Sequence, residues 1–160
     1  MSLKRSSFVG GCALGLVLAT GVQAQAAAPG RVLTFINGPT NSVGVGFDIN
    51  GNTAPPVGSR LEFTLRIKNS GTQFGKPSGT IVGRVLIDCV VISEPTPQTA
   101  DGNCFGIAHV PDGFFTFEGN GPISNQKVQY YAITGGVGPY ADVRGEIKSV
   151  GERDVVRLST

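Results

Sequence analysis

The stretch RLEFTLRIK, residues 60–68, constrains the fold most, because its apolar and polar side chains alternate without exception. Successive side chains of a β-strand point to opposite faces, so the alternation predicts a strand with one buried face. That face carries the four apolar residues Leu61, Phe63, Leu65 and Ile67. The opposite face is charged or hydroxylated, and we expect it to contact water.

The chain after residue 30 continues in β-branched and aromatic runs rather than in helical patterns. These runs occupy residues 79–93, 103–110, 114–119, 128–134, 140–150 and 154–159. Many of the 24 glycines and 10 prolines separate them, and we expect a loop at residues 95–102 and a turn at 111–113. About eight short strands joined in this way predict one all-β domain, either a sandwich or a barrel.

The N-terminal segment has the features of an export signal. Lys4 and Arg5 precede an apolar segment at residues 8–22, and small residues then surround Ala24 and Ala26. This apolar segment is shorter than the roughly 20 residues that span a membrane. We therefore expect residues 1–24 to be a secretory signal, cleaved after Ala24 or Ala26, and residues 31–160 to form a single secreted or periplasmic domain.

The charge balance excludes one class of partner. Removing Lys4 and Arg5 takes the 13 basic residues to 11, which equals the 11 acidic residues. A neutral domain without a run of lysines and arginines is poorly suited to follow a phosphate backbone. We expect no nucleic-acid partner, and no membrane partner once the signal is removed.

Two cysteines remain in the domain, since Cys12 lies in the expected signal. In an oxidising compartment, the pair Cys89 and Cys104 indicates a disulfide. The two positions flank the expected loop, so we favour a cross-strand bond over the alternative of a free Cys89 thiol. Two cysteines and a single histidine fall short of the four ligands of a structural zinc site, so we expect no metal.

Residues 136–141 match the glycine fingerprint of dinucleotide-binding folds, with Asp154 near the distance of a ribose contact. That fold needs a helix after the glycines and then a second parallel strand. Here residues 140–150 have the pattern of a strand, and Pro139 favours a turn. We therefore interpret the motif as a strand–turn–strand hairpin that binds no phosphate.

The same hairpin, YAITGGVGPYADVRGEI, resembles the characteristic hairpin of the allene oxide cyclase-like and dirigent families. VGRVLIDCVVIS is similar to the preceding strand of the cyclases, and DGFFTFEGNGP and RLEFTLRIK are similar to two further segments. The resemblance covers about residues 33–150, in the right order. It implies an eight-stranded antiparallel up-and-down β-barrel.

These families hold a reactive small molecule inside a dry barrel, where cyclases close a fatty-acid epoxide and dirigent proteins steer the coupling of phenoxy radicals. The resemblance implies that this chain binds a small apolar, phenolic or lipid-like molecule in its lumen, without a cofactor. It would act as an isomerase or cyclase, by orientation and exclusion of water, or as a non-catalytic dirigent-like auxiliary or carrier. A structural domain with a filled core is a third alternative, and the sequence leaves open whether the chain forms a homo-oligomer.

The cyclase site carries over only in part. Cys89 and Asn37 match polar positions of the cyclase cavity. Phe35 and Leu65 stand where the cyclases are expected to carry a carboxylate and an asparagine, so the resemblance implies a more apolar cavity. Arg144 matches an arginine of the dirigent hairpin.

Four charged residues are candidates for catalytic roles: Arg84, Asp88, Glu118 and Arg144. Arg84 and Asp88 share one face of an expected central strand, where a charge in an apolar cavity would polarise a substrate. The alternative is a solvated pair on the outer surface. The candidate ligand-binding residues are Asn37, Phe35, Leu65, Cys89, Phe115, Phe117, Tyr131 and Tyr140. His109 has no sequence neighbour suited to a triad, and we interpret it as a strand residue.

Overall fold

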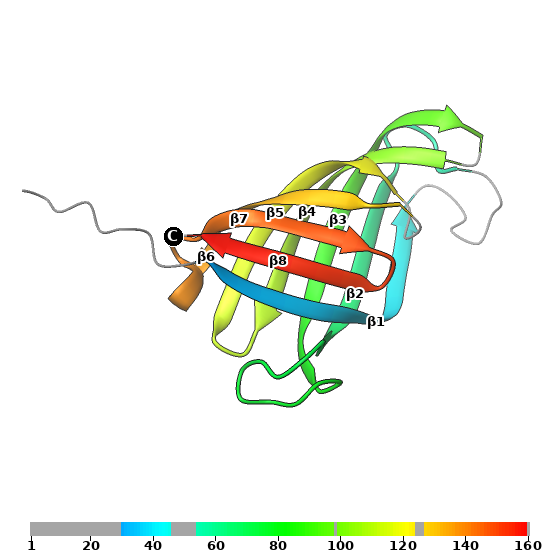
Figure 1. The fold of residues 1–160 in the computed structure, drawn as a ribbon. Helices are drawn as coiled ribbons and strands as arrows, with labels where there is room; N and C mark the ends of the chain where they lie inside the picture. The colour runs from blue at the N-terminus through cyan, green and yellow to red at the C-terminus, as the bar shows by residue number, and fades with distance from the viewer. Residues whose placement is uncertain (1–29, 46–53, 98, 124–126, 160) are drawn as a thin grey trace, which may run out of the picture.

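The computed structural model describes residues 30–45, 54–97, 99–123 and 127–159. They form one closed barrel in which each strand is antiparallel to the next and the last strand pairs with the first (Figure 1). The strands are β1 (Arg31–Val45), β2 (Arg60–Asn69), β3 (Ile81–Thr96), β4 (Thr99–Val110), β5 (Gly113–Pro122), β6 (Gln129–Val137), β7 (Arg144–Val150) and β8 (Arg153–Ser159). The prediction of an eight-stranded antiparallel barrel is confirmed.

The expected export signal lies outside the described residues, and so do both of its cleavage positions. Among the residues that are described, no helix is long and apolar enough to cross a membrane.

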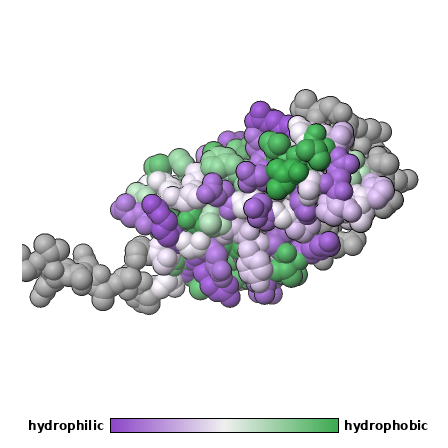
Figure 2. Space-filling model, turned by 90° about the horizontal axis from the view of Figure 1, so that it is seen from above, coloured by the Kyte–Doolittle hydropathy of each residue, from purple (hydrophilic) through white to green (hydrophobic). Residues whose placement is uncertain are grey.

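The alternation of side chains decides which residues face the barrel interior. In β2, Leu61 and Ile67 are buried, whereas Arg60, Glu62 and Arg66 are exposed. The other strands follow the same period of two except where the register shifts, so one set of side chains fills the interior and the other contacts solvent. Figure 2 shows the result on one outer face, where hydrophilic side chains surround smaller hydrophobic groups.

The hairpin between β3 and β4 is longer than the sequence predicts. Its last pair is Thr96 with Thr99, so the expected loop at residues 95–102 is wrong. The register shifts between Val91 and Thr96, and this irregularity accommodates Pro95 because a proline cannot donate a ladder hydrogen bond. The hairpin consequently extends past the neighbouring strands at one end of the barrel (Figure 1).

The glycine motif connects two antiparallel strands, as the sequence analysis expected. The short 3-10 turn η1 (Gly138–Tyr140) lies between β6 and β7. Gly138 has a φ of 70°, a left-handed conformation that favours glycine. A Cβ on Gly136 would lie 2.3 Å from the Phe114 carbonyl oxygen, so only glycine fits there.

Aromatic side chains close the end of the barrel at which η1 lies. Tyr140 is only 1% exposed and packs against Phe115, with ring centroids 5.7 Å apart. Phe74, from the loop between β2 and β3, stacks on Phe35 with centroids 6.4 Å apart. Arg31 lies over both outer rings, 5.1 Å from the centroid of Phe74 and 5.9 Å from that of Tyr140. This end of the barrel is therefore filled by side chains.

Asn69 holds that loop in place. Its side chain is fully buried, and its Nδ2 donates hydrogen bonds to the carbonyls of Gln73 and Lys76, both at 2.9 Å, and of Pro77 at 3.4 Å. The Gln73 side chain in turn pairs with the backbone of Thr34 in β1, accepting from its N–H and donating to its carbonyl. One buried amide thus determines how the loop closes the barrel.

Candidate functional site

The barrel encloses a cavity of about 350 Å³ whose polar residues lie toward the end opposite η1. Its wall is mainly apolar and includes Phe35, Phe63, Leu65, Ile67, Val85, Ile87, Phe115, Phe117, Ile147 and Val156. These residues come from six of the strands. The other two, β4 and β6, also contribute to the wall, with Ala108 and Tyr131 among others. The interior is therefore not a completely filled core.

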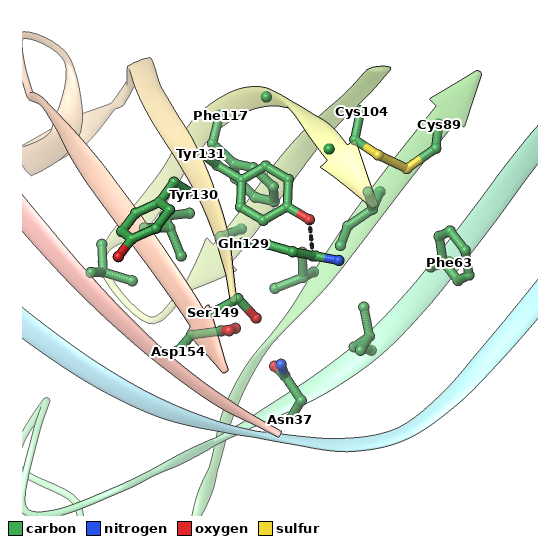
Figure 3. A pocket seen from close by; sticks show the side chains of 18 of the residues that line it. Asn37, Phe63, Cys89, Cys104, Phe117, Gln129, Tyr130, Tyr131, Ser149 and Asp154 are labelled. Carbon is green, nitrogen blue, oxygen red and sulfur yellow. Dashed lines mark hydrogen bonds between the residues drawn. A yellow bond between two sulfur atoms is a disulfide. The ribbon is translucent and has the colours of Figure 1, made fainter. Parts of the chain in front are cut away.

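A row of polar side chains crosses one side of this cavity. Gln129 in β6 pairs with Ser149 in β7, and Ser149 pairs with Asp154 in β8. Asn37 continues the row in β1, where its backbone N–H donates to the Glu152 carbonyl at 2.7 Å. Figure 3 shows the side chains of Asp154, Ser149 and Asn37 pointing toward one another.

Asp154 is the most unusual member of the row. Burial raises the pKa of its carboxyl above the ordinary value, while hydrogen bonding to Ser149 and to Asn37 opposes the shift. Two buried acceptors, Asp154 Oδ1 and Asn37 Oδ1, have no hydrogen-bond partner among the described residues. Among the described residues that line the cavity, Asp154 carries the only carboxyl group. The site therefore holds one acid whose protonated form is favoured by its surroundings.

Tyr131 lines the same cavity from β6, two strands away from the β8 strand that carries Asp154. Burial, and secondly the charge of Asp154, raise the pKa of its phenol to about 12. Its hydroxyl donates to Gln129 Oε1 at 2.5 Å (Figure 3). Gln129 Nε2 in turn donates to the Pro122 carbonyl at 2.5 Å. The Tyr131 ring packs edge-on against Phe117, with centroids 5.4 Å apart. The phenol is thus oriented and stays protonated at neutral pH, so it acts as a hydrogen-bond donor and not as a base.

Seven of the eight residues that the sequence analysis suggested for ligand binding line this cavity: Phe35, Asn37, Leu65, Cys89, Phe115, Phe117 and Tyr131. Cys89 is bonded to Cys104, its direct partner in the register of β3 and β4. The disulfide is confirmed, and it forms part of the cavity wall in place of a free thiol. Tyr140, the eighth residue, is not among the lining residues, because it fills the closed end against Phe115.

None of the four charged candidates lines the cavity, which corrects their expected placement. Arg84 and Glu118 are exposed, and Asp88 forms an ion pair with Arg60 on the outer surface. Arg144 is also exposed and donates to the Val143 carbonyl at 2.8 Å. The reason is the period of two, since the buried Val85, Cys89, Phe117 and Ile147 take the inward positions of the same strands.

The cavity is also lined by Asp154, Ser149 and Gln129, none of which was predicted from the sequence to face it. A signal for Asp154 was nonetheless present, because it alternates with Val156 and Leu158, two residues that are buried. Ser149 follows Ile147 at the same spacing. A polar residue that continues the apolar face of a strand is expected to point inward, whatever its own polarity.

No group of three or more histidine, cysteine, aspartate or glutamate side chains within the described ranges is arranged to hold a metal ion.

Comparisons with known proteins support the fold. The sequence matches no protein-family model and no curated protein. The structure is similar to that of a pyocyanin demethylase, with a TM-score of 0.60 and 22% identity over 81% of this chain and 98% of that one. It is also similar to the pterocarpan synthase dirigent protein GePTS1, with a TM-score of 0.50 and 14% identity over 86% of this chain and 85% of that one. The chain therefore shares the fold of these two proteins, one of which is a dirigent protein, and that fold is a closed eight-stranded barrel here.

Proposed function

We propose that this protein binds a small, mostly apolar molecule in its lumen and isomerises it by proton transfer through Asp154. The observation that carries the proposal is a single carboxyl group, with a raised pKa, within the polar row of a mainly apolar cavity wall. Enzymes commonly bring a carboxyl pKa toward neutrality by burial, so that one group can both take and return a proton.

The cavity suits a small ligand. Its volume of about 350 Å³ lies at the lower end of the range for small-molecule sites, which are mostly apolar with a few convergent polar groups. The phenyl rings of Phe35, Phe63, Phe115 and Phe117 provide the apolar surface. A hydroxyl or N–H of the ligand would satisfy the unpartnered oxygens of Asp154 and Asn37.

In the proposed reaction, Asp154 removes a proton from one atom of the substrate and returns it to another, so that no atom or electron is gained or lost. Negative charge then develops on a substrate oxygen. We propose that the Asn37 amide donates a hydrogen bond to this oxygen, and the bond acts strongly because most of the surrounding wall is apolar. The single proton of the Tyr131 hydroxyl is donated to Gln129 Oε1, so Tyr131 orients Gln129 and does not donate to the substrate. The apolar residues exclude water and hold one conformer of the substrate.

Deuterium exchange tests the proton transfer without knowledge of the substrate. Molecules that co-purify with the exported protein are identified by native mass spectrometry, and the complex is then transferred to D₂O. Wild-type protein is expected to incorporate deuterium into the bound molecule, and Asp154→Asn is expected to slow incorporation by roughly 100-fold or more, because general acid–base catalysis contributes about 10²–10⁴-fold. Asp142→Asn removes an exposed carboxyl and is the control.

A carrier function is the second candidate, and the predominance of apolar residues in the cavity wall favours it. Displacement of the uncharged dye N-phenyl-1-naphthylamine measures ligand binding separately from deuterium exchange. The two measurements together distinguish a carrier from an isomerase. Retained binding with no deuterium exchange in either wild type or Asp154→Asn would identify a carrier and rule out the isomerase.

The stability of Asp154→Asn is expected to depend on pH in a direction that follows from the raised pKa. A carboxyl group whose pKa is raised by folding lowers the free energy of unfolding once the pH exceeds its pKa in the unfolded chain, which is about 4. This loss of stability grows until the pH passes the pKa of the same group in the folded protein. The neutral asparagine has no such cost. Asp154→Asn should therefore match the wild type near pH 4 and melt at a higher temperature at pH 8, whereas a lower melting temperature at pH 8 would contradict this account.

Activity against a fatty-acid allene oxide is expected to be no better than background. Phe35 and Leu65 line the cavity where the family resemblance implies polar groups that anchor the epoxide. The purified protein is mixed with freshly generated allene oxide, and the products are separated by chiral chromatography. Formation of one cyclopentenone enantiomer would contradict the prediction.

We further propose that the protein is exported. The Cys89–Cys104 disulfide is consistent with an oxidising compartment. Expression of the full chain with fractionation, followed by N-terminal sequencing of the exported form, tests both the location and cleavage after Ala24 or Ala26.

A further inference from the structure

Three basic side chains lie side by side on the outer face of the barrel. Arg66 in β2 is directly opposite Arg84 in β3, and Arg84 is directly opposite His109 in β4. Side chains in such positions lie about 5 Å apart at their Cβ atoms. The three residues therefore form a continuous row across three neighbouring strands.

This basic row lines a surface groove. The groove also contains the apolar side chains of Ile81, Val82, Val110 and Pro111, so its surface combines positive charge with apolar contact. Ile81 is 48% exposed, although it is a large hydrophobic residue. The His109 ring packs against Phe114, with centroids 5.5 Å apart, which places the imidazole at one side of the groove.

The two arginines have no protein partner in the described part of the chain. Neither makes a side-chain hydrogen bond or an ion pair there, and both residues are exposed. Glu62 and Asp88, which share this outer face with the two arginines, are both engaged by Arg60 further along the strands. Two like charges directly opposite each other in a sheet are destabilising, so an anion held between them would remove an unfavourable interaction.

We propose that this groove is a second binding site, specific for a phosphate or sulfate monoester with an apolar substituent. A guanidinium presents parallel N–H donors that match two oxygens of such a group, and two guanidiniums side by side can hold it from both flanks. The substituent would lie against the exposed Ile81 and Pro111. The site is separate from the lumen, because Arg84 faces outward and the adjacent Val85 lines the cavity.

Phosphate chemistry can come from a soluble ester or from a lipid headgroup, and the same groove residues would recognise both. Inorganic phosphate and phenyl phosphate serve as soluble probes, titrated at constant ionic strength and followed by amide chemical shifts and by melting temperature. Phosphatidylcholine vesicles with and without phosphatidic acid, whose headgroup is a phosphate monoester, test the lipid source by co-sedimentation. Binding both to the soluble probes and to phosphatidic acid vesicles would indicate a headgroup site, and binding to the soluble probes alone would indicate a soluble ester.

The expected result is saturable binding of phosphate with a roughly millimolar Kd, and tighter binding of phenyl phosphate. Arg66→Gln and Arg84→Gln should each weaken binding about tenfold and abolish the rise in melting temperature that a ligand of the native state produces. The control Arg153→Gln removes one exposed charge from β8, which is not adjacent to this face, and should change neither quantity. Equal binding by the wild type and both groove variants, or no saturable binding of any probe, would overturn the proposal.

Discussion

Replacing both Cys89 and Cys104 with serine is expected to lower the free energy of unfolding by roughly 3 kcal/mol. The two residues are 15 positions apart in sequence. Closing a loop of that length lowers the conformational entropy of the unfolded chain, which raises its free energy by about 3 kcal/mol. A small domain is stable by only about 5–15 kcal/mol, so the loss is large, but the barrel should still form. Urea unfolding of the two proteins under non-reducing conditions measures the difference.

Dithiothreitol gives the matched control, because it should destabilise the wild type and leave the double serine variant unchanged. Titration of the unfolded, unreduced protein should detect no free thiol from Cys89 or Cys104. Two reactive thiols per chain, or equal urea midpoints for the two proteins, would be incompatible with a stabilising disulfide. Since the disulfide lines the cavity, the variant also shows whether ligand binding depends on this part of the wall.

Asn69→Asp is expected to lower the free energy of unfolding by about 3–4 kcal/mol at pH 7.5. The amide nitrogen of Asn69 donates to three backbone carbonyls, and a carboxylate of the same shape would place negative charge against all three. A buried group left without its partner costs about 1–3 kcal/mol, and more when it is charged. The backbone N–H of Asn69 also donates to the Thr80 carbonyl, so the substitution acts at the base of the loop that closes the barrel.

Two comparisons separate this effect from that of added charge. Asn103→Asp introduces the same charge at an exposed position in β4 and should change the urea midpoint little. The loss of stability caused by Asn69→Asp should also become smaller below about pH 5, because a protonated carboxyl group again has a hydrogen to donate. The folded state then binds this proton more tightly than the unfolded state does, so acid favours the folded variant. A deficit that stays constant from pH 8 to pH 4 would argue against the lost amide donor as its cause.

The sequence by itself determined most of the strands and the inward face of residues 60–68, and the family resemblance implied their order. Alternation in residues 60–68 identified the buried Leu61 and Ile67, and the glycine motif was correctly interpreted as a hairpin. The pairing of Cys89 with Cys104 was also predictable, because the two residues flank a hairpin. These properties are local: they follow from the period of a β-strand and from the chemistry of turns, and both can be seen in a short window of residues.

Only the tertiary structure decided which polar residues form the site. Asp154, Ser149, Gln129 and Asn37 come from four consecutive strands around the closed barrel, and the register between those strands places them in one row. Arg84 and Asp88 seemed suited to the interior because they share a strand face, but the barrel turns that face outward. Neither register nor barrel closure is a local property, because both result from the simultaneous packing of all eight strands around one core.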